Sequence, residues 1–359
     1  LSPQNSLERK MKTDDFRKIF RSSFPDPEEW QRWFFSRVVR EEDIYLATDH
    51  SGRAASALLM QPYGFRYRGA ELPSAYISCV ATLPEARSAG LSSGLMRTAL
   101  KDAHAKGLAL GSLIPAEDHL YGFYSRFGFE STYFADEMRY PSLHSFATHD
   151  AALIPADFAV FSALEAAYGE GIIHSKDDYE HVYEDLALDE ASERLAVELP
   201  DGSRSILFAS YSPAPGAEVK VKALLNDTPE AAEAALAQLR ARTGERPFLV
   251  NRPPVSSEKY YLRHRGMMRI TTPEPILSTL AASAPELKTT IRLTDDIIAD
   301  KNADLDISDA KLPRLEHRMA KADLEVHIDT LAGILFSDSR IGGIFGLPAS
   351  RPYMTLMLD

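Results

Sequence analysis

The N-terminal part of the chain carries two apolar stripes with the three- and four-residue spacing of helices. The segment "TDDFRKIF" predicts a first helix that Thr13 or Asp14 would cap. "FPDPEEW" predicts the start of a second helix, with Asp26 as N-cap and Pro27 at the first helical position. The apolar stripe of this second helix consists of Trp30, Trp33, Phe34 and Val38.

Apolar runs of strand length follow, and one of them leads into a loop of small residues. Strands are predicted at about 44–48, 54–60 and 74–82, with the turn "DHSG" between the first two. The third strand continues through "RSAGLSSG" (87–94) into a helix whose apolar positions recur every four residues and which ends at Lys106-Gly107. A buried strand at 108–114, a short helix at 118–128 and a strand at 133–140 complete this region.

The region 156–272 repeats the second half of that order but has no small-residue loop. Asp201-Gly202 marks a hairpin, Thr228 caps the long helix, and "SSEKYYLRHRG" (256–266) predicts a short helix. From residue 273 the pattern changes to that of a small α+β domain. Its expected elements are strands within 287–297, 303–308 and 323–328, a helix from Asp329, a glycine-rich turn at 341–346 and a final strand at 352–358.

Length and composition narrow the functional class. The chain has 359 residues, which predicts two or three domains, and its 45% hydrophobic and 26% charged residues are ordinary for a soluble protein. No apolar run reaches the roughly 18 residues of a membrane span, and the N-terminal segment lacks the apolar core of a signal peptide. The net charge of −12 argues against nucleic acid. The single cysteine precludes an intrachain disulfide and a cysteine-rich metal site, and favours the cytoplasm.

The small-residue loop indicates that a phosphate approaches the backbone. The first N–H groups of a helix have no partner within the helix and create a positive potential, and small residues leave access to them. Arg87 would add charge, and Ser92 and Ser93 would add hydroxyl donors. The phosphate-loop motif ending in Gly-Lys-Ser/Thr and the dinucleotide motif Gly-x-Gly-x-x-Gly are both absent. The alternative on the residues alone is a tight strand-to-helix turn.

Arg87-Ser-Ala-Gly90, directly after a strand, resembles the pyrophosphate loop of the GNAT N-acetyltransferases, and "FYSRFGF" (123–129) resembles their tyrosine-containing short helix. The whole order, with "LRHRGMMRI" at 262–270, is similar to the enhanced-intracellular-survival (Eis-type) acetyltransferases. This resemblance implies an α/β fold with tandem GNAT units, the second one degenerate, and a small sterol-carrier-like α+β domain. The implied boundaries are 1–145, 146–274 and 275–359.

The resemblance also implies that acetyl-CoA is the co-substrate. The strand before the loop would offer backbone groups to the pantetheine arm through Cys79, Val80 and Ala81. The pyrophosphate would lie on Arg87, Ser88, Ala89, Gly90, Leu91 and Ser92. Ser92 departs from the family, which usually has glycine or alanine there. For Cys79 the alternative is a packing role, because a lone cysteine on a buried strand is mostly structural.

Acyl transfer to an amine needs a proton donor for the leaving thiolate and a base for the attacking amine. The resemblance implies that Tyr124 is the general acid. Tyr121 is the second candidate for this role, and the alternative for Tyr124 is a purely structural role. The resemblance implies that the base is the C-terminal carboxylate of Asp359. The alternative is that the final strand is an ordinary edge strand whose acidic end lies in solvent. Glu117, His119 and His104 are expected at the surface. An acceptor pocket would be walled by Phe24, Trp30, Trp33 and Phe34, which otherwise form helical core.

The sequence therefore predicts a cytoplasmic N-acetyltransferase. Its acceptor would be a primary amine on a cationic small molecule or on a lysine side chain, with no nucleic-acid partner and, by resemblance, a homo-oligomeric state. The alternative is a lipid- or small-ligand-binding protein that uses the sterol-carrier-like domain, with the acetyltransferase units as its scaffold. The loop and Tyr124 favour the enzyme, because a scaffold needs neither.

Overall fold

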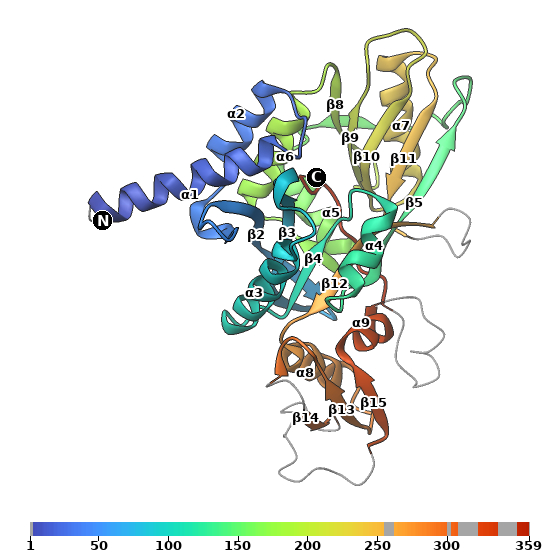
Figure 1. Ribbon diagram of the computed structural model, residues 1–359. Helices are drawn as coiled ribbons and strands as arrows, with labels where there is room; N and C mark the ends of the chain where they lie inside the picture. The colour runs from blue at the N-terminus through green and yellow to red at the C-terminus, as the bar shows by residue number, and fades with distance from the viewer. Residues whose placement is uncertain (1–2, 255–261, 300–302, 308–321, 337–349, 359) are drawn as a thin grey trace. The chain divides into compact units, whose positions relative to one another are not determined.

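A computed structural model describes residues 3–254, 262–299, 303–307, 322–336 and 350–358. The chain divides into two compact units (Figure 1). The first unit contains residues 1–132 and 266–350, and the second contains 133–265 and 351–358. The mixed α/β fold class is confirmed.

The first unit is built on a mixed sheet in the order β1-β2-β3-β4-β12. Strands β1 to β3 pair antiparallel, β3 and β4 pair parallel, and the Met267–Ile270 part of β12 pairs antiparallel with β4. The bounds are β1 Ile44–Thr48, β2 Ala54–Tyr67, β3 Ala70–Thr82, β4 Leu110–Leu113 and β12 Leu262–Ile270. The parallel pair needs a crossover, and the loop and helix between β3 and β4 provide it.

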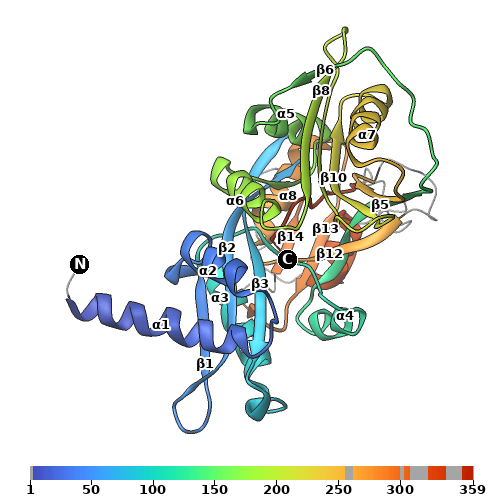
Figure 2. The same ribbon diagram turned by 90° about the horizontal axis from the view of Figure 1, so that it is seen from above.

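The helices α1 (Pro3–Arg21) and α3 (Leu91–Ala105) both pack against strands β1 and β2 (Figures 1 and 2). Helix α3 buries Leu95, Met96 and Ala99 on one face, as its four-residue spacing predicts. The remaining helical elements before β5 are α2 (Glu28–Arg37), α4 (Asp118–Ser125) and the short 3₁₀ turns η1 (Glu41–Asp43) and η2 (Pro84–Ala86).

Two predicted helix caps were wrong. Helix α1 already begins at Pro3, so Thr13 and Asp14 lie inside it; the polar segment before them consists largely of good helix formers and continues the helix. Helix α2 begins at Glu28 with Pro27 at the N-cap and without a side-chain capping bond. Asp26 therefore lies one residue outside the cap, and its carbonyl accepts a 2.7 Å hydrogen bond from Gln31 Nε2 instead.

The C-terminal part of the first unit is a small α+β region. Its three-stranded sheet has the order β14-β13-β15, with β13 antiparallel to β14 and parallel to β15. The bounds are α8 Pro273–Ser283, β13 Thr290–Thr294, β14 Ala303–Asp306, β15 Leu324–His327 and α9 Ile328–Phe336. These elements match the predicted ones, and the glycine-rich turn at 341–346 lies outside the described residues.

The second unit has strands in the order β5-β11-β10-β9-β8-β6. Strands β10 and β11 are parallel and flank the crossover helix α7, which repeats the β3-α3-β4 arrangement. The bounds are β5 Glu130–Tyr140, β6 Ala152–Ile154, α5 Phe158–Tyr168, β7 Gly171–Ile173, α6 Lys176–Leu186, β8 Ser192–Glu198, β9 Arg204–Ser210, β10 Val219–Asn226, α7 Pro229–Thr243 and β11 Phe248–Arg252. Thr228 caps α7 as predicted.

Two further predictions differ from the structure. The short helix expected over 256–266 is wrong in its second half, because residues 262–266 belong to strand β12; residues 255–261 lie outside the described part. The strand expected at 352–358 is reduced to one parallel bridge between Tyr353 and Gly171. A run of apolar residues indicates that a segment is buried but does not show that a partner strand pairs with it. A buried irregular segment therefore has the same pattern as a strand.

Candidate functional site

The loop between β3 and α3 presents an open helix N-terminus. Residues Arg87, Ser88, Ala89 and Gly90 are all exposed. Ser88 and Gly90 adopt positive φ angles of 67° and 76°, and Gly90 is the N-cap of α3 without a side-chain capping bond. Because the first N–H groups of a helix have no acceptor within it, those of α3 are available to an anion.

The equivalent position in the second unit is closed. There Thr228 is the N-cap of α7, and its Oγ1 accepts a 3.3 Å hydrogen bond from the Ala231 N–H. That side chain occupies the place where an anion would bind the helix start. The two crossover helices therefore differ at their N-termini: that of α3 has no side-chain cap, whereas that of α7 is capped by Thr228.

Strand β3 is bulged directly before the loop. Its register with β2 shifts between the pairs Leu59↔Ser78 and Ala57↔Ala81, so that Cys79 and Val80 face one residue of β2. Cys79 has a φ of 54°, a conformation that residues other than glycine seldom adopt. The pairing of β3 with β4 extends only as far as Tyr76↔Ser112. Beyond that pair, within the described residues, β3 has a strand partner on one side only, which leaves a backbone edge for an extended ligand.

Tyr124 lies in helix α4 in the hydrophobic core of the first unit. It is 7% exposed, and its ring packs edge-on against Phe123 and Phe129, with centroids 5.1 and 6.1 Å away. Burial, with a smaller electrostatic effect from Cys79, raises the pKa of the Tyr124 phenol to about 12. The phenol is therefore protonated at neutral pH and can donate a proton or a hydrogen bond.

Cys79 is unsuited to act as a nucleophile. Burial raises the pKa of its thiol to about 12, so at neutral pH the reactive thiolate is almost absent. The raised pKa of the thiol thus argues against a covalent intermediate on Cys79.

Asp26 is the residue of this site that sequence reasoning missed. Its carboxyl group is half-buried, acts electrostatically on Cys79, and has a pKa raised by burial. Pro27 holds Asp26 in an extended conformation, which a helix N-cap also adopts, so no feature of the sequence distinguishes Asp26 from a cap.

The predicted aromatic wall forms one cluster. Phe24 lies 4.7 Å from Phe20, and Trp30 stacks on Phe34 at 4.8 Å. Phe34 is 3% exposed and belongs to the core, whereas Phe24, Trp30 and Trp33 are half-buried. The edge of the cluster that a ligand could reach therefore consists of these three side chains.

The other acid–base candidates of the sequence lie at the surface or are partly exposed. Glu117 and His119 form an ion pair with 3.2 Å between Oε2 and Nδ1, and both side chains are 71% exposed. His104 is half-buried, and its Nδ1 lies 3.1 Å from Thr272 Oγ1. Tyr121 is half-buried on the helix that carries Tyr124.

The C-terminal segment 351–358 is docked into the second unit. The Tyr353 N–H donates to the Glu170 carbonyl at 3.0 Å, the Ile172 N–H donates to the Tyr353 carbonyl at 3.1 Å, and the Tyr168 hydroxyl donates to the Arg351 carbonyl at 2.8 Å. A side chain at Gly171 would place Cβ 2.1 Å from the Tyr353 oxygen, so this close approach requires glycine. Asp359 itself lies outside the described residues.

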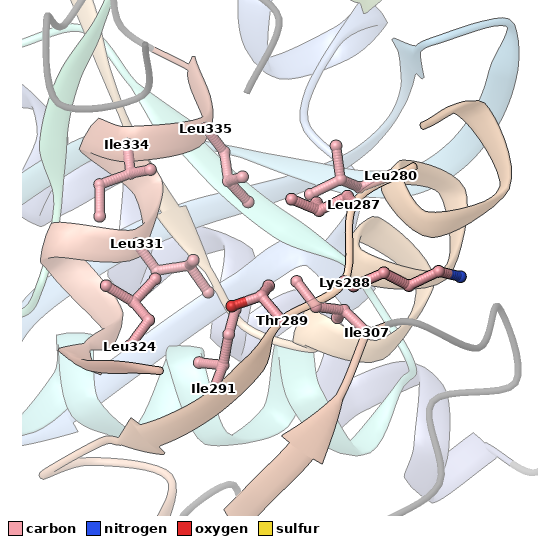
Figure 3. A pocket seen from close by; sticks show the side chains of 10 residues that line it. All are labelled: Leu280, Leu287, Lys288, Thr289, Ile291, Ile307, Leu324, Leu331, Ile334 and Leu335. Atoms are coloured by element: carbon pink, nitrogen blue, oxygen red, sulfur yellow. The ribbon is translucent and has the colours of Figure 1, made fainter. Parts of the chain in front are cut away.

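An apolar cavity lies in the C-terminal part of the first unit, between α8, α9 and the β13 sheet (Figure 3). Its volume is about 140 Å³. This is close to the cavity of about 150 Å³ that holds a benzene ring in an engineered protein, so a whole sterol is too large for it. The residues lining it are Leu280, Leu287, Lys288, Thr289, Ile291, Ile307, Leu324, Leu331, Ile334 and Leu335.

No group of three or more histidine, cysteine, aspartate or glutamate side chains among the described residues is arranged to hold a metal ion. No helix in the described part of the chain combines the length and the apolar character needed to cross a membrane.

Comparison with known proteins agrees with this geometry. Residues 7–132 match the acetyltransferase (GNAT) domain family. The chain carries a GNAT acetyltransferase domain. The uncapped loop, the bulged strand β3 and Tyr124 all lie within this GNAT domain. A GNAT domain supports an acyltransferase activity, and GNAT domains use an acyl-CoA as co-substrate. No curated protein matches the chain.

Solved structures share the fold over nearly the whole chain. Eis1 from Mycobacterium abscessus is 17% identical with a TM-score of 0.70, covering 94% of this chain and 91% of that one. A GCN5-related N-acetyltransferase from Anabaena variabilis is 16% identical with a TM-score of 0.70, covering 96% and 91%. A protein of unknown function from Enterococcus faecalis, described as a probable N-acyltransferase, is 15% identical with a TM-score of 0.74, covering 96% and 97%. At this identity the likeness establishes the fold.

Proposed function

We propose that the protein is an acetyl-CoA-dependent N-acetyltransferase acting on a primary amine of a cationic small molecule or a lysine side chain. The observation that carries the proposal is the uncapped N-terminus of α3, which directly follows a bulged strand with a free edge. A degenerate copy of this arrangement in the same chain fills that place with Thr228. The net charge of −12 and the half-buried carboxyl group of Asp26 favour a cationic acceptor.

In the proposed complex, the pyrophosphate of acetyl-CoA accepts hydrogen bonds from the N–H groups at the start of α3, with the Arg87 guanidinium as counter-charge. The pantetheine arm lies along the free edge of β3 at Cys79, Val80 and Ala81. This arrangement needs the loop to stay open, which agrees with the empty space around Gly90, where a Cβ would meet no atom within 4 Å.

The chemistry is a single displacement. The neutral amine nitrogen attacks the thioester carbon, the new C–N bond forms, the C–S bond breaks, and the products are an amide and free CoA. Tyr124 donates its proton to the departing thiolate, and a base takes the proton that the amine loses. We propose that the base is the C-terminal carboxylate of Asp359, and the hydrogen bonds that hold the preceding segment support this. Asp26 is the second carboxylate and attracts the ammonium form of the acceptor.

We further propose that the three parts of the chain, 1–145, 146–274 and 275–359, are an active GNAT domain, a degenerate GNAT-like domain and a sterol-carrier-like domain. A homo-oligomer in the cytoplasm fits the resemblance and the single cysteine.

The test is release of free thiol from acetyl-CoA with a panel of polyamines, aminoglycosides and lysine peptides. We expect turnover with at least one cationic amine, and turnover lower by about 10²–10⁴ with Tyr124→Phe under the same conditions. Cys79→Ala should keep turnover, because direct transfer does not use the thiol. The absence of turnover with every amine would reject the proposal.

A second candidate function rests on the apolar cavity of Figure 3. It would make the protein a binder of small apolar groups, such as a short alkyl chain, with the GNAT units as scaffold. Titration with octanoate, followed by calorimetry, tests this. Binding that Leu331→Trp abolishes, in a protein with no acyltransferase turnover, would favour this function over the enzyme.

A further inference from the structure

A buried ion pair between Arg269 and Asp295 lies against the turn that ends helix α4. Arg269 belongs to strand β12 and Asp295 directly follows β13. Nη2 of the arginine donates to both carboxylate oxygens at 2.8 Å, and both side chains are 1% exposed. Among the described residues Asp295 is the only hydrogen-bond partner of this guanidinium, because its Nε and Nη1 are buried and make no hydrogen bond. The position of the guanidinium therefore depends on Asp295 alone.

The guanidinium covers the backbone of the turn at Gly128. A Cβ at Gly128 would lie 2.9 Å from Nη1 of Arg269 and 3.2 Å from its Cδ and Cζ. Gly128 has a φ of 79°, and the N–H groups of Phe127 and Phe129 on either side of it donate to the Tyr124 carbonyl, at 2.9 and 3.5 Å. Arg269 thus lies against the turn that holds the backbone of Tyr124.

The ring of Tyr124 is held from the same part of the chain. Asp295 Oδ1 accepts hydrogen bonds from the N–H groups of Ile297 and Ile298, at 2.8 and 3.0 Å. Both isoleucines pack in the hydrophobic cluster that contains Tyr124. Met267, which lies two residues before the arginine and so on the same face of β12, belongs to this cluster as well. The ion pair therefore joins two segments that both contact the surroundings of the tyrosine.

Helix α4 cannot fix its own position. It has eight residues, and its N-cap makes no side-chain hydrogen bond. A helix this short is not stable by itself, so its place in the domain is set by tertiary contacts. The contacts described above come from residues 267–298, which lie outside the matched GNAT region 7–132 but in the same compact unit. A buried ion pair is seldom more stable than apolar residues of similar volume, so stability alone does not explain it.

We propose that Arg269, fixed by Asp295, is a positioning residue that places the phenol of Tyr124 at the acyl-transfer site. The guanidinium holds the turn behind the tyrosine, and the isoleucines after Asp295 hold its ring. The catalytic part rests on the proposed function, in which Tyr124 is the general acid. The structural part, in which the pair holds the end of α4, does not depend on that role. Activity of the GNAT domain thus requires a segment that follows the second unit in the chain.

The experiment removes both charges together, in Arg269→Met/Asp295→Asn. The methionine keeps most of the side-chain length, and the asparagine oxygen still accepts from the N–H groups of Ile297 and Ile298. Because no unpaired ion remains buried, urea unfolding should show a much smaller loss of stability than removal of one partner. We expect kcat for thiol release to fall about tenfold or more, because a misplaced acid is a poor donor, while the Kd for acetyl-CoA stays the same.

The matched control is Arg292→Met/Asp304→Asn. It removes an ion pair with 2.9 Å between Nε and Oδ1 that joins β13 to β14 within the small sheet, and it should leave kcat unchanged. Hydrogen exchange gives the structural readout. The amides of Phe127 and Phe129 should exchange about tenfold faster in Arg269→Met/Asp295→Asn than in the unchanged protein, and at the unchanged rate in the control.

A double-mutant cycle shows whether the effect on kcat passes through Tyr124. In a Tyr124→Phe protein, Arg269→Met/Asp295→Asn should lower kcat less than about twofold further, because the group that the pair positions is already absent. A further loss of about tenfold there would mean that the pair acts by another route, and it overturns the proposal. An unchanged kcat in Arg269→Met/Asp295→Asn with Tyr124 present overturns it as well.

Two further outcomes are decided by hydrogen exchange. If Arg269→Met/Asp295→Asn does not fold, the unchanged protein is measured: the amides of Phe127 and Phe129 should be as protected as those of strand β12, and exchange about tenfold faster than β12 overturns the proposal. If Tyr124→Phe turns over normally, the proposed acid is wrong. Exchange at Phe127 and Phe129 in the charge-free variant then decides the structural part, and an unchanged rate rejects it.

Discussion

Arg269 Nη2 donates a hydrogen bond of 2.8 Å to each carboxylate oxygen of Asp295, and both side chains are 1% exposed. Asp295 Oδ1 also accepts from the N–H groups of Ile297 and Ile298, at 2.8 and 3.0 Å. These two isoleucines pack in the same core cluster as Tyr124. A buried ion pair thus connects the C-terminal part of the first unit to the core that holds the proposed general acid.

Removing one partner of this pair should destabilise the protein strongly. Asp295→Ala leaves the Arg269 guanidinium buried without its counter-charge, and such a loss costs about 3–5 kcal/mol. Urea unfolding followed by circular dichroism measures the change. Glu85→Gln, which removes the partner of the exposed Arg53, is the control and should change stability little. A small effect of Asp295→Ala would show that the guanidinium finds another partner.

Gly128 lies under the same arginine. It has a φ of 79°, and a Cβ there would lie 2.9 Å from Arg269 Nη1. Gly128→Ala combines backbone strain with this clash, so we expect a loss of about 2–4 kcal/mol. Gly107→Ala is the matched control, because Gly107 has a φ of 74° with no atom within 4 Å of its Cβ position and shows the strain alone, about 1–2 kcal/mol. Equal losses in the two variants would mean that Arg269 moves freely.

Gly90 tests the cofactor site. Gly90→Trp places a large side chain over the start of α3, where the pyrophosphate is proposed to bind, and should weaken acetyl-CoA binding at least about a hundredfold because it obstructs the N–H groups. Calorimetric titration gives the Kd. Gly107→Trp introduces the same residue with the same backbone strain at the other end of that helix and should leave the Kd unchanged. Equal affinity of the two variants for acetyl-CoA would show that the cofactor binds elsewhere.

Tyr124→Phe should reduce kcat by about 10²–10⁴, the usual range for loss of a general acid, with little effect on the Kd for acetyl-CoA. A phenol is the proton donor below its pKa and is lost as donor when the pH rises through that value. Because the pKa of Tyr124 is raised to about 12, its donor form persists throughout the range from pH 6 to pH 10. Kinetics over this range should therefore show no decline in kcat from titration of Tyr124.

The sequence was informative where function depends on local backbone geometry. The small residues 87–94 predicted the loop, and the spacing of Leu91 and Leu95 predicted the helix after it. The buried ion pair between Arg269 and Asp295 was not predicted, because its two partners are 26 residues apart in the chain and meet only in the folded structure. Local patterns identify helix caps and the buried faces of helices. They do not identify which buried side chains contact one another in the folded protein.

The C-terminal segment 351–358 illustrates both cases, because its burial was predicted from the sequence and its contacts were not. Its apolar residues correctly indicated burial, although only Tyr353 takes part in a bridge. In the proposed mechanism the base is the terminal carboxylate of Asp359, and two variants separate it from the side-chain carboxylate. A short glycine–serine extension displaces the terminal carboxylate and keeps the side chain, whereas Asp359→Asn removes only the side-chain charge.

We expect the extension to lower kcat by about 10²-fold or more, as for loss of a general base, and Asp359→Asn to lower it less than about threefold. Acetyl-CoA binding should be the same in both proteins, since the cofactor is proposed to bind at the loop before α3. An identical extension at the N-terminus controls for the added residues. If the C-terminally extended protein turns over like the native one while Asp26→Asn is inactive, the base is Asp26, a carboxyl group whose pKa is raised by burial.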